Sequence, residues 1–166
     1  MIRRSRLHVS LLALSVVACE RAQQTVAGSA PNAARAEVEA AMQRYMAAAR
    51  AVNADSMAAS FAPDGELLEP GIPVVASRDS IRAFMGSFPG VRVDSATAVA
   101  DTIEVMGDVA FYWGSYFERL AFPGQPASEQ HGKFVIEWSR QSDGRWFIRR
   151  YYRIPLSTVV DSVKAR

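Results

Sequence analysis

Apolar residues recur at helical spacing between Arg35 and Val52. Their positions step by four, three, four and three residues: Val38, Met42, Tyr45, Ala49 and Val52. This spacing places them on one face of a helix, the face that packs against the rest of a protein. We therefore predict a helix over Arg35–Val52, with the Tyr45 ring pointing inward from the middle of the apolar stripe.

Two shorter helices and a short strand are predicted next. Asp55 can cap a second helix that runs through Phe61, and Pro63 is expected to end it because proline lacks the backbone N–H that a helix uses. A tight turn then leads into a short strand over Glu66–Glu69. Ser77 can cap a third helix, whose inward positions again have helical spacing: Ile81, Phe84, Met85 and Phe88.

From Arg92 onward the pattern changes to period two, which is typical of strands. Four candidate strands follow one another: about Arg92–Met106, Val109–Leu120, Ser128–Arg140 and Arg145–Ile154. Gly107-Asp108 and Asp143-Gly144 are hairpin signals, so the strands that they join are expected to be antiparallel. Three helices before a run of long antiparallel strands predict the α+β class, with the helices on one face of a curved sheet.

The composition is that of an ordinary globular domain, and only the net charge adds information about possible partners. The 166 residues are 49% hydrophobic and 22% charged, and the net charge is +2. Three arginines near the N-terminus, Arg3, Arg4 and Arg6, are expected to be removed, which lowers the net charge by three, to −1. Nucleic-acid binding needs a strongly positive surface, so we predict no nucleic-acid partner.

The N-terminal segment resembles the signal sequence of bacterial lipoproteins. MIRRSR supplies positive charge, and LHVSLLALSVVA is apolar but shorter than the about 20 residues of a membrane-spanning helix. Val16-Val17-Ala18 precede Cys19, the only cysteine, as a lipobox precedes the lipidated cysteine of that family. The resemblance implies cleavage after Ala18 and lipidation of Cys19. The alternatives are an ordinary secretory signal, or a thiol buried in an N-terminal helix.

These patterns divide the chain and give it an expected location. We predict a signal peptide over 1–18, a lipidated cysteine and flexible tether over 19–34, a folded domain over 35–156 and a C-terminal tail over 157–166. The tether is small and polar, so it buries too little apolar surface to fold. Glu20 replaces the Asp of the inner-membrane retention signal, which favours the outer membrane, on its periplasm-facing side. Membrane contact is expected through the lipid anchor only; the alternative is a secreted protein.

The folded part has the order helix, helix, short strand, helix, meander, and it contains the segments FAPDGELLEPGIP, SIRAF and GKFVIEWSRQSDGRWFI. In this order and in these segments it is similar to the SnoaL-like family of the nuclear-transport-factor-2-like fold, distantly similar to ketosteroid isomerase. The match covers roughly Ala36 to Ile154, and Ser77 departs from the glycine often found before the third helix. The resemblance implies a cone-shaped, curved antiparallel sheet with three N-terminal helices on its concave face.

By sequence, three residues match, or lie near, positions at which ketosteroid isomerase carries catalytic groups. Tyr45 in MQRY matches the oxyanion tyrosine, and Glu69, an acid directly before a proline, matches the base. Glu137 in FVIEW lies near the second oxyanion donor if the next hairpin is one residue shorter. By this resemblance Glu69 could move a proton and Tyr45 could stabilise an enolate. The catalytic residues stay open, because Tyr45 also fits a core position and Glu137 can form an ion pair.

The last hairpin is rich in arginines with aromatic residues between them: Arg140, Arg145, Arg149, Arg150 and Arg153. Strict alternation would place one group of side chains on the same face: Phe147, Arg149, Tyr151 and Arg153. Guanidinium groups can bind an anion bidentately. The candidate ligand-binding residues are therefore Arg149, Tyr151 and Arg153, with Trp113 and Tyr116. Alternatively, the arginines face water or pair with carboxylates: Glu69, Glu118 and Glu137.

The sequence carries no metal or cofactor signature, and we predict neither. His131 is the only histidine beyond the signal, and no Gly-rich phosphate loop, nucleophile elbow or CxxC motif occurs. Three hypotheses for function follow. The domain binds a small apolar or anionic molecule in its cone, or it is an isomerase, cyclase or dehydratase that uses Glu69 and Tyr45. The third is an interaction module with a filled cone. The resemblance also implies a homodimer through the outer face of the sheet.

Overall fold

The computed structural model describes residues 31–161, and its elements follow the predicted α+β order. They are α1 (Pro31–Arg50), α2 (Ala54–Ala59), β1 (Phe61–Leu68), β2 (Val75–Ala76), α3 (Arg78–Met85), β3 (Arg92–Met106), β4 (Val109–Ala121), β5 (Ser128–Arg140) and β6 (Trp146–Val160). Residues 31–34 are helical rather than part of the predicted tether, and β6 continues into the predicted tail. The predicted signal peptide and Cys19 lie outside the described residues.

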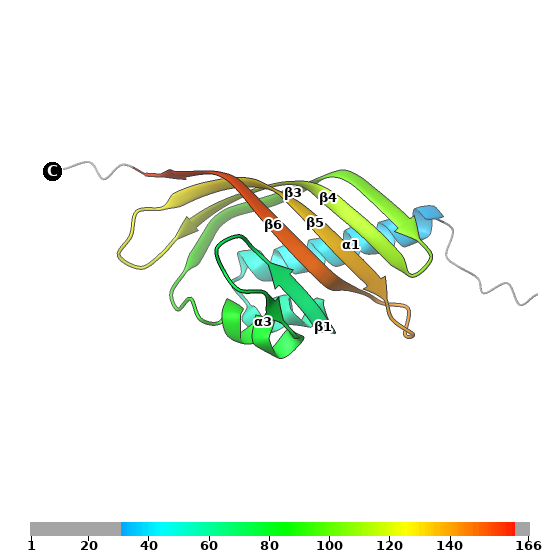
Figure 1. The fold of residues 1–166 in the computed structure, drawn as a ribbon. Helices are drawn as coiled ribbons and strands as arrows, with labels where there is room; N and C mark the ends of the chain where they lie inside the picture. Colours follow the sequence, from blue (N-terminus) through cyan, green and yellow to red (C-terminus); the bar gives the residue numbers. More distant parts are fainter. Residues whose placement is uncertain (1–30, 162–166) are drawn as a thin grey trace, which may run out of the picture.

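The strands form one curved sheet in the order β2-β1-β6-β5-β4-β3. Figure 1 shows α1 crossing one face of the long strands, with α3 and β1 grouped at one side of the sheet. The neighbouring strands of residues 31–161 are antiparallel, except that β1 and β6 run parallel. The expectation of antiparallel pairing does not hold for this pair. β1 and β6 are not joined by a hairpin: β2, α3 and three long strands lie between them in the chain, and a connection of this length allows the parallel direction.

α1 is held against the sheet by its apolar stripe and by an arginine near each end. Val38 and Met42 are 0% exposed, and Tyr45 is buried beside them, as the helical spacing predicts. Burying an aliphatic side chain of this size contributes about 1.5–3 kcal/mol. Arg35 donates a hydrogen bond to the carbonyl of Ile103, and Arg50 donates to the carbonyl of Ala96. Both acceptors lie on β3, so α1 is fixed lengthwise along that strand.

The second helix begins and ends earlier than predicted. Its N-cap is Asn53 rather than Asp55, because the Asn53 side-chain oxygen accepts from the backbone N–H of Ser56. The helix ends at Ala59, and Pro63 lies within β1 instead of ending a helix. The β1–β6 pairing shifts register between Phe61 and Glu66, so Pro63 sits in an irregular stretch. Proline is tolerated at such a point because no ladder hydrogen bond needs its nitrogen.

Ser77 caps α3 as predicted, and its backbone adopts a conformation that favours glycine. Its hydroxyl accepts from the backbone N–H of Ser80 at 3.3 Å. Its φ is 80°, in the region that side chains other than glycine rarely adopt. Ser77 therefore combines a favourable cap with an unfavourable backbone conformation.

β6 contains a bulge that changes which residues face the core. Glu137 of β5 pairs with Arg150, but the next residue, Trp138, pairs with Ile148. Arg149 is therefore an extra residue on β6. Ile148 and Tyr151, three positions apart, are both buried, whereas strict alternation would place them on opposite faces. The predicted grouping of Arg149 with Tyr151 and Arg153 is wrong for this reason.

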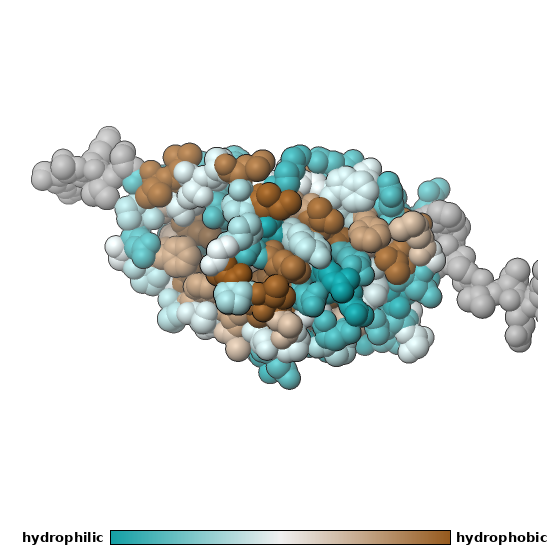
Figure 2. Space-filling view, in the orientation of Figure 1, coloured by the Kyte–Doolittle hydropathy of each residue, from teal (hydrophilic) through white to brown (hydrophobic). Residues whose placement is uncertain are grey.

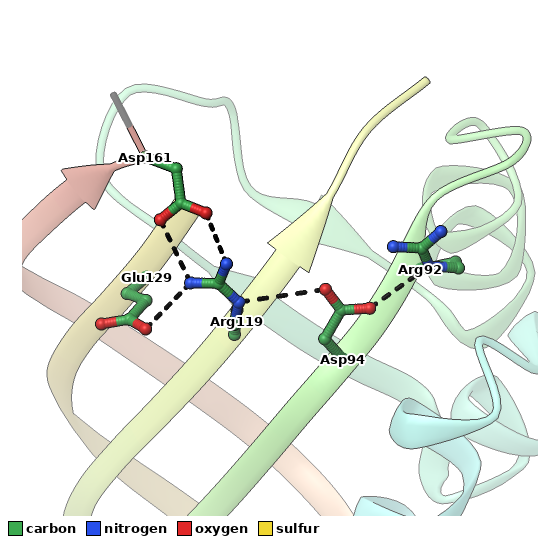
Figure 3. Close-up of polar contacts among 5 residues, drawn as sticks. All are labelled: Arg92, Asp94, Arg119, Glu129 and Asp161. Carbon is green, nitrogen blue, oxygen red and sulfur yellow. Dashed lines mark hydrogen bonds and ion pairs between the residues drawn. The ribbon is translucent and has the colours of Figure 1, made fainter. Parts of the chain in front are cut away.

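A cluster of charged residues joins the strand ends at one end of the sheet. Figure 3 shows the Arg119 guanidinium between Asp161, Glu129 and Asp94, with Arg92 on the far side of Asp94. The hydrogen bonds from Arg119 to Asp161 and Glu129 raise the pKa of the guanidinium. The cluster links β3, β4 and β5 to Asp161, directly after β6.

The outer face of the sheet, turned away from α1, carries exposed hydrophobic side chains. Brown patches mark hydrophobic residues on the face shown in Figure 2. On β6, Tyr152 and Ile154 alternate with the inward-facing Tyr151 and Arg153, so both point outward. The exposed hydrophobic residues of β3 and β6 include Val99, Tyr152, Ile154 and Leu156. Such a patch on a soluble domain commonly marks a contact surface.

Candidate functional site

A cavity of about 310 Å³ lies between the helices and the concave face of the sheet. Its walls are mainly apolar: Met46, Ala49, Val52, Met57, Leu67, Phe84, Met85, Val91, Val93, Ala96, Ala98, Leu120 and Phe122. Phe88, which is 39% exposed, also lines it. A space of this size, with apolar walls and a few polar groups, is typical of small-molecule sites.

Five of the predicted site residues line this cavity together: Tyr45, Glu69, Tyr116, Tyr151 and Arg153. They come from α1, the residue after β1, β4 and β6. α1 brings Tyr45 over the sheet, and the parallel pairing of Leu67 with Tyr151 brings the end of β1 beside the middle of β6. Residues that are far apart in the chain therefore share one space.

Two predicted residues, Glu137 and Trp113, lie on the outer face. The sequence neighbours of Glu137 on both sides are 0% exposed, so its own side chain points away from the core. There it accepts a hydrogen bond from Arg150 at 3.0 Å, which is the ion pair that the sequence left open. Trp113 likewise stands between two buried residues of β4. Neither side chain lines the cavity, so the expectation that they face the cone is wrong.

Arg149 is also outside the cavity, because it is the extra residue of the β6 bulge. Its guanidinium pairs with Asp64 at 3.1 Å on the β1 side of the sheet. Arg150 pairs with Glu66 and Glu137 instead. Of the arginines in the last hairpin, Arg153 alone lines the cavity.

Tyr45 and Tyr151 form an aromatic pair in the wall of the cavity. Their ring centroids are 5.6 Å apart and the planes are 76° apart, an edge-to-face arrangement. Burial raises the pKa of Tyr45 well above its usual value, and burial also raises the pKa of Tyr151 to about 12. Both phenols are therefore neutral at physiological pH. Within residues 31–161, neither hydroxyl makes a hydrogen bond, so both can serve a ligand.

Arg153 is held by a carboxylate and an aromatic ring. Its Nη2 donates to Glu118 Oε1, and its guanidinium carbon lies 4.6 Å from the Tyr116 ring centroid. Burial alone would lower the pKa of Arg153, but its neighbours Tyr151, Glu118 and Glu69 hold it well above its usual value. Arg153 Nε and the Tyr116 hydroxyl are closed to solvent and have no partner within the described residues.

Glu69 lies at the boundary between the cavity and an outer groove. It follows Leu68, the last residue of β1, and lines the cavity and a groove formed with Pro70, Ile72 and other apolar residues. In the part of the chain that the structure describes, its carboxylate makes no hydrogen bond or ion pair. It is close enough to raise the pKa values of Tyr45 and Arg153.

Several residues of this site were not predicted from the sequence. Gln130 and Thr97 line the cavity without a motif that would mark them. Glu118 was expected only as a partner for an arginine, and its pair with Arg153 confirms that alternative. Phe84 and Met85 were predicted to face inward from the third helix, and they do so as part of the cavity wall. Helical spacing can predict an inward face but not whether the space beneath it is filled.

The groups present can hold a ligand and, in principle, move a proton. Glu69 accepts hydrogen bonds, while the neutral phenols of Tyr45 and Tyr151 can donate or accept. Among residues 31–161 there is no group of three or more His, Cys, Asp or Glu side chains arranged to hold a metal ion.

Comparison with solved structures shows the same fold in several bacterial proteins. A ketosteroid isomerase-like protein from Erwinia carotovora atroseptica SCRI1043 is 19% identical, with a TM-score of 0.69, over 76% of this chain and 98% of that chain. A protein of unknown function from Mycobacterium tuberculosis is 22% identical, with a TM-score of 0.65, over 73% and 70%. A conserved protein from Planctomyces limnophilus DSM 3776 is 17% identical, with a TM-score of 0.67, over 75% and 99%.

The family comparison agrees with the fold and with the predicted resemblance. A search of curated proteins gave no match. Residues 32–152, which span α1 to the middle of β6, match the SnoaL-like domain. The chain therefore belongs to the SnoaL-like domain family.

Proposed function

We propose that this domain binds a small, largely apolar molecule in the cavity beneath α1. The observation that carries the proposal is the cavity itself: about 310 Å³ of space with apolar walls, into which Tyr45, Tyr151 and Glu69 bring polar groups that are not committed to other residues. Apolar walls supply affinity, and a few polar groups fix the orientation of a ligand. This space also argues against the interaction module with a filled cone.

Adjacent residues on β3 provide a matched test of this proposal. Ala98 lines the cavity, whereas the next residue, Val99, points outward and is 63% exposed. Ala98→Trp should fill the space, while Val99→Trp adds the same ring to the opposite face. The probe is 2-naphthylmethanol, and the readout is thermal unfolding. At about 100 times its Kd a ligand stabilises the folded state by about 2.7 kcal/mol.

The expected result is that the probe stabilises the wild type and Val99→Trp, but not Ala98→Trp. Equal stabilisation of the two variants would place the probe elsewhere and contradict the proposal. Circular dichroism of both variants checks that each one is folded.

Isomerase-type chemistry is the second candidate, because Glu69 and Tyr45 line the same cavity. Glu69 would take a proton from carbon, and the neutral Tyr45 phenol would donate to the enolate oxygen. Glu137 has no part in it, because it points outward. The test follows proton exchange of 2-tetralone in D2O by NMR. Glu69→Gln should remove any acceleration of the exchange that the wild type gives. Glu66→Gln should not, because Glu66 pairs with Arg150. Exchange at the uncatalysed rate with wild-type protein would reject this candidate.

We also propose that the chain is a lipoprotein of the cell envelope, supported by the lipobox-like residues before Cys19. None of the helices within residues 31–161 has the length and apolar character to span a membrane. Several acyl chains on one cysteine would anchor the protein firmly, since each buried methylene contributes about 0.8 kcal/mol. Cys19→Ser should move the protein from the membrane fraction to the soluble fraction. Unchanged membrane association would contradict the lipid anchor.

A further inference from the structure

The ionisable groups of the cavity carry an unbalanced charge. Among the residues that line it, the charged ones are Glu69, Glu118 and Arg153. Two carboxylates and one guanidinium leave one negative charge in excess. Apolar walls weaken the screening of charges inside such a space, so this excess acts strongly on a ligand. An anionic ligand would be repelled, and a cationic one attracted.

Arg153, the cation of the cavity, is already paired. Its Nη2 donates to Glu118 and lies 3.4 Å from Gln130 Oε1, while the guanidinium stacks on Tyr116. The side chains of Arg153 and Glu118 are 19% and 17% exposed, so the pair is shielded from solvent. An anion that took Nη2 from Glu118 would leave that carboxylate buried without a partner. The Nε of Arg153 has no partner among residues 31–161, but it is closed to solvent.

Glu69, by contrast, is a carboxylate without a hydrogen bond or ion pair within residues 31–161. An ionised carboxylate only accepts hydrogen bonds, so the ligand group beside it must donate. An ammonium group donates up to three hydrogen bonds and neutralises the charge, whereas a hydroxyl donates one and does not. The nearby phenol oxygens of Tyr45 and Tyr151 can accept the remaining N–H groups.

The walls of the cavity suit an organic cation as well as an apolar body. Aromatic side chains make up a large part of the lining: Tyr45, Phe84, Phe88, Tyr116, Phe117, Phe122 and Tyr151. The face of an aromatic ring is electrostatically negative and attracts a positively charged nitrogen.

From these charges and contacts we propose that the cavity selects an apolar molecule that carries a protonated amine, with Glu69 as its counter-ion. This inference rests on the proposed binding function and names the ligand class for that site. It replaces the expectation of an anionic ligand, which depended on Arg149 and Arg153 together. Arg149 lies outside the cavity, and Arg153 is paired with Glu118.

The test compares three probes with the same naphthalene body and different charges at pH 7. They are 2-naphthylmethylamine (a cation), 2-naphthylmethanol (neutral) and 2-naphthoate (an anion), each titrated into the wild-type protein by calorimetry. We expect the amine to bind about tenfold more tightly than the alcohol, as a charged hydrogen-bonded contact allows, and the carboxylate most weakly.

Two variants that remove one acid each locate the effect. Glu69→Gln should lower the amine affinity about tenfold and the alcohol affinity by a much smaller factor, because the alcohol makes no charged contact with this residue. Glu66→Gln makes the same change of charge three residues earlier, on β1, but Glu66 faces Arg150 outside the cavity, so both affinities should stay unchanged. Carboxylate binding as tight as amine binding, or equal effects of the two variants, would overturn the amine selectivity and leave the cavity as a binding site. No binding by any probe would overturn both proposals.

Discussion

The guanidinium carbon of Arg153 lies 4.6 Å from the centroid of the Tyr116 ring, in the wall of the cavity. The same ring lies against Gly132 on β5, where an added Cβ would be 2.3 Å from Tyr116 Cε1. Glycine thus lets the ring lie close to the sheet, and the ring in turn positions Arg153 beside Glu118.

Gly132→Ala should therefore disturb the cavity as well as the fold. The new methyl group would meet the Tyr116 ring and the Ile154 carbonyl, at 2.5 Å, and overpacking of this kind costs about 1–3 kcal/mol. Urea unfolding measures the loss, and 2-naphthylmethanol binding should weaken with it. Gly107→Ala, at a φ of 63° but in open space, should cost about 1 kcal/mol and leave binding unchanged. Normal binding by Gly132→Ala would show that the Tyr116 contact is dispensable.

Two substitutions of Ser77 can separate the free-energy cost of its backbone conformation from the stabilisation that its helix cap provides. Ser77→Gly relieves the φ of 80° and, for a Ser-to-Gly change at an N-cap, loses only a few tenths of a kcal/mol, so we expect a net gain of about 1 kcal/mol. Ser77→Ala keeps the unfavourable φ and loses the hydrogen bond to Ser80, so it should cost about 1 kcal/mol. The measurement is the midpoint of urea unfolding. Destabilisation by both variants would mean that the side-chain cap outweighs the backbone cost.

The raised pKa of Tyr151 predicts a loss of stability at high pH. The folded state keeps the phenol proton to about pH 12, whereas an unfolded tyrosine releases it near pH 10. The contribution is complete below about pH 10 and is lost as the pH rises to about 12, which corresponds to about 2–3 kcal/mol. Tyr151→Phe should lose less stability than the wild type over this range in urea unfolding. Stability curves of the wild type and Tyr151→Phe that run parallel over this pH range would contradict the raised pKa of Tyr151.

The homodimer predicted from the sequence can be tested on the outer face of the sheet. A row of paired residues crosses this face from β4 to β1: Trp113, Val135, Tyr152 and Leu68. A two-fold dimer would cover this row with the same row of a second copy. Ile154→Asp, next to the row, should give a monomer by light scattering. Met106→Asp, at the β3–β4 hairpin and 58% exposed, is the control and should remain a dimer. A monomeric wild type would contradict the prediction.

Periodicity predicted most of the fold, because burial on one side of an element leaves a regular mark in the sequence. β3 and β5 have the predicted bounds, and the stripe of α1 faces the core as expected. The bulge at Arg149 produces no regular pattern in the sequence. One inserted residue reverses the alternation of buried and exposed positions but does not change the residue types around it. Strict alternation therefore places Arg149 on the wrong face, although it correctly places Tyr151 and Arg153 in the cone.

Candidate site residues were predictable where the resemblance and the local pattern agreed. Tyr45 lies on a helical stripe and at a matched motif, and it lines the cavity. The match of Glu137 to an oxyanion donor depended on an assumed hairpin length. Both neighbours of Glu137 on β5 are buried, and alternation along the strand therefore places its side chain on the outer face. The charge balance could not be predicted, because it depends on which acids line the cavity: Glu69 and Glu118 do so, whereas Glu137 points outward.

The most direct test of a binding cavity is methyl NMR of methionines during titration with 2-naphthylmethanol. Met46, Met57 and Met85 line the cavity, whereas Met106 is exposed at the β3–β4 hairpin. A cavity that binds the probe predicts saturable shifts of the three lining methyl signals, with the Met106 signal unmoved. Saturable shifts confined to Met106, or no shifts at all, would contradict a small-molecule site beneath α1.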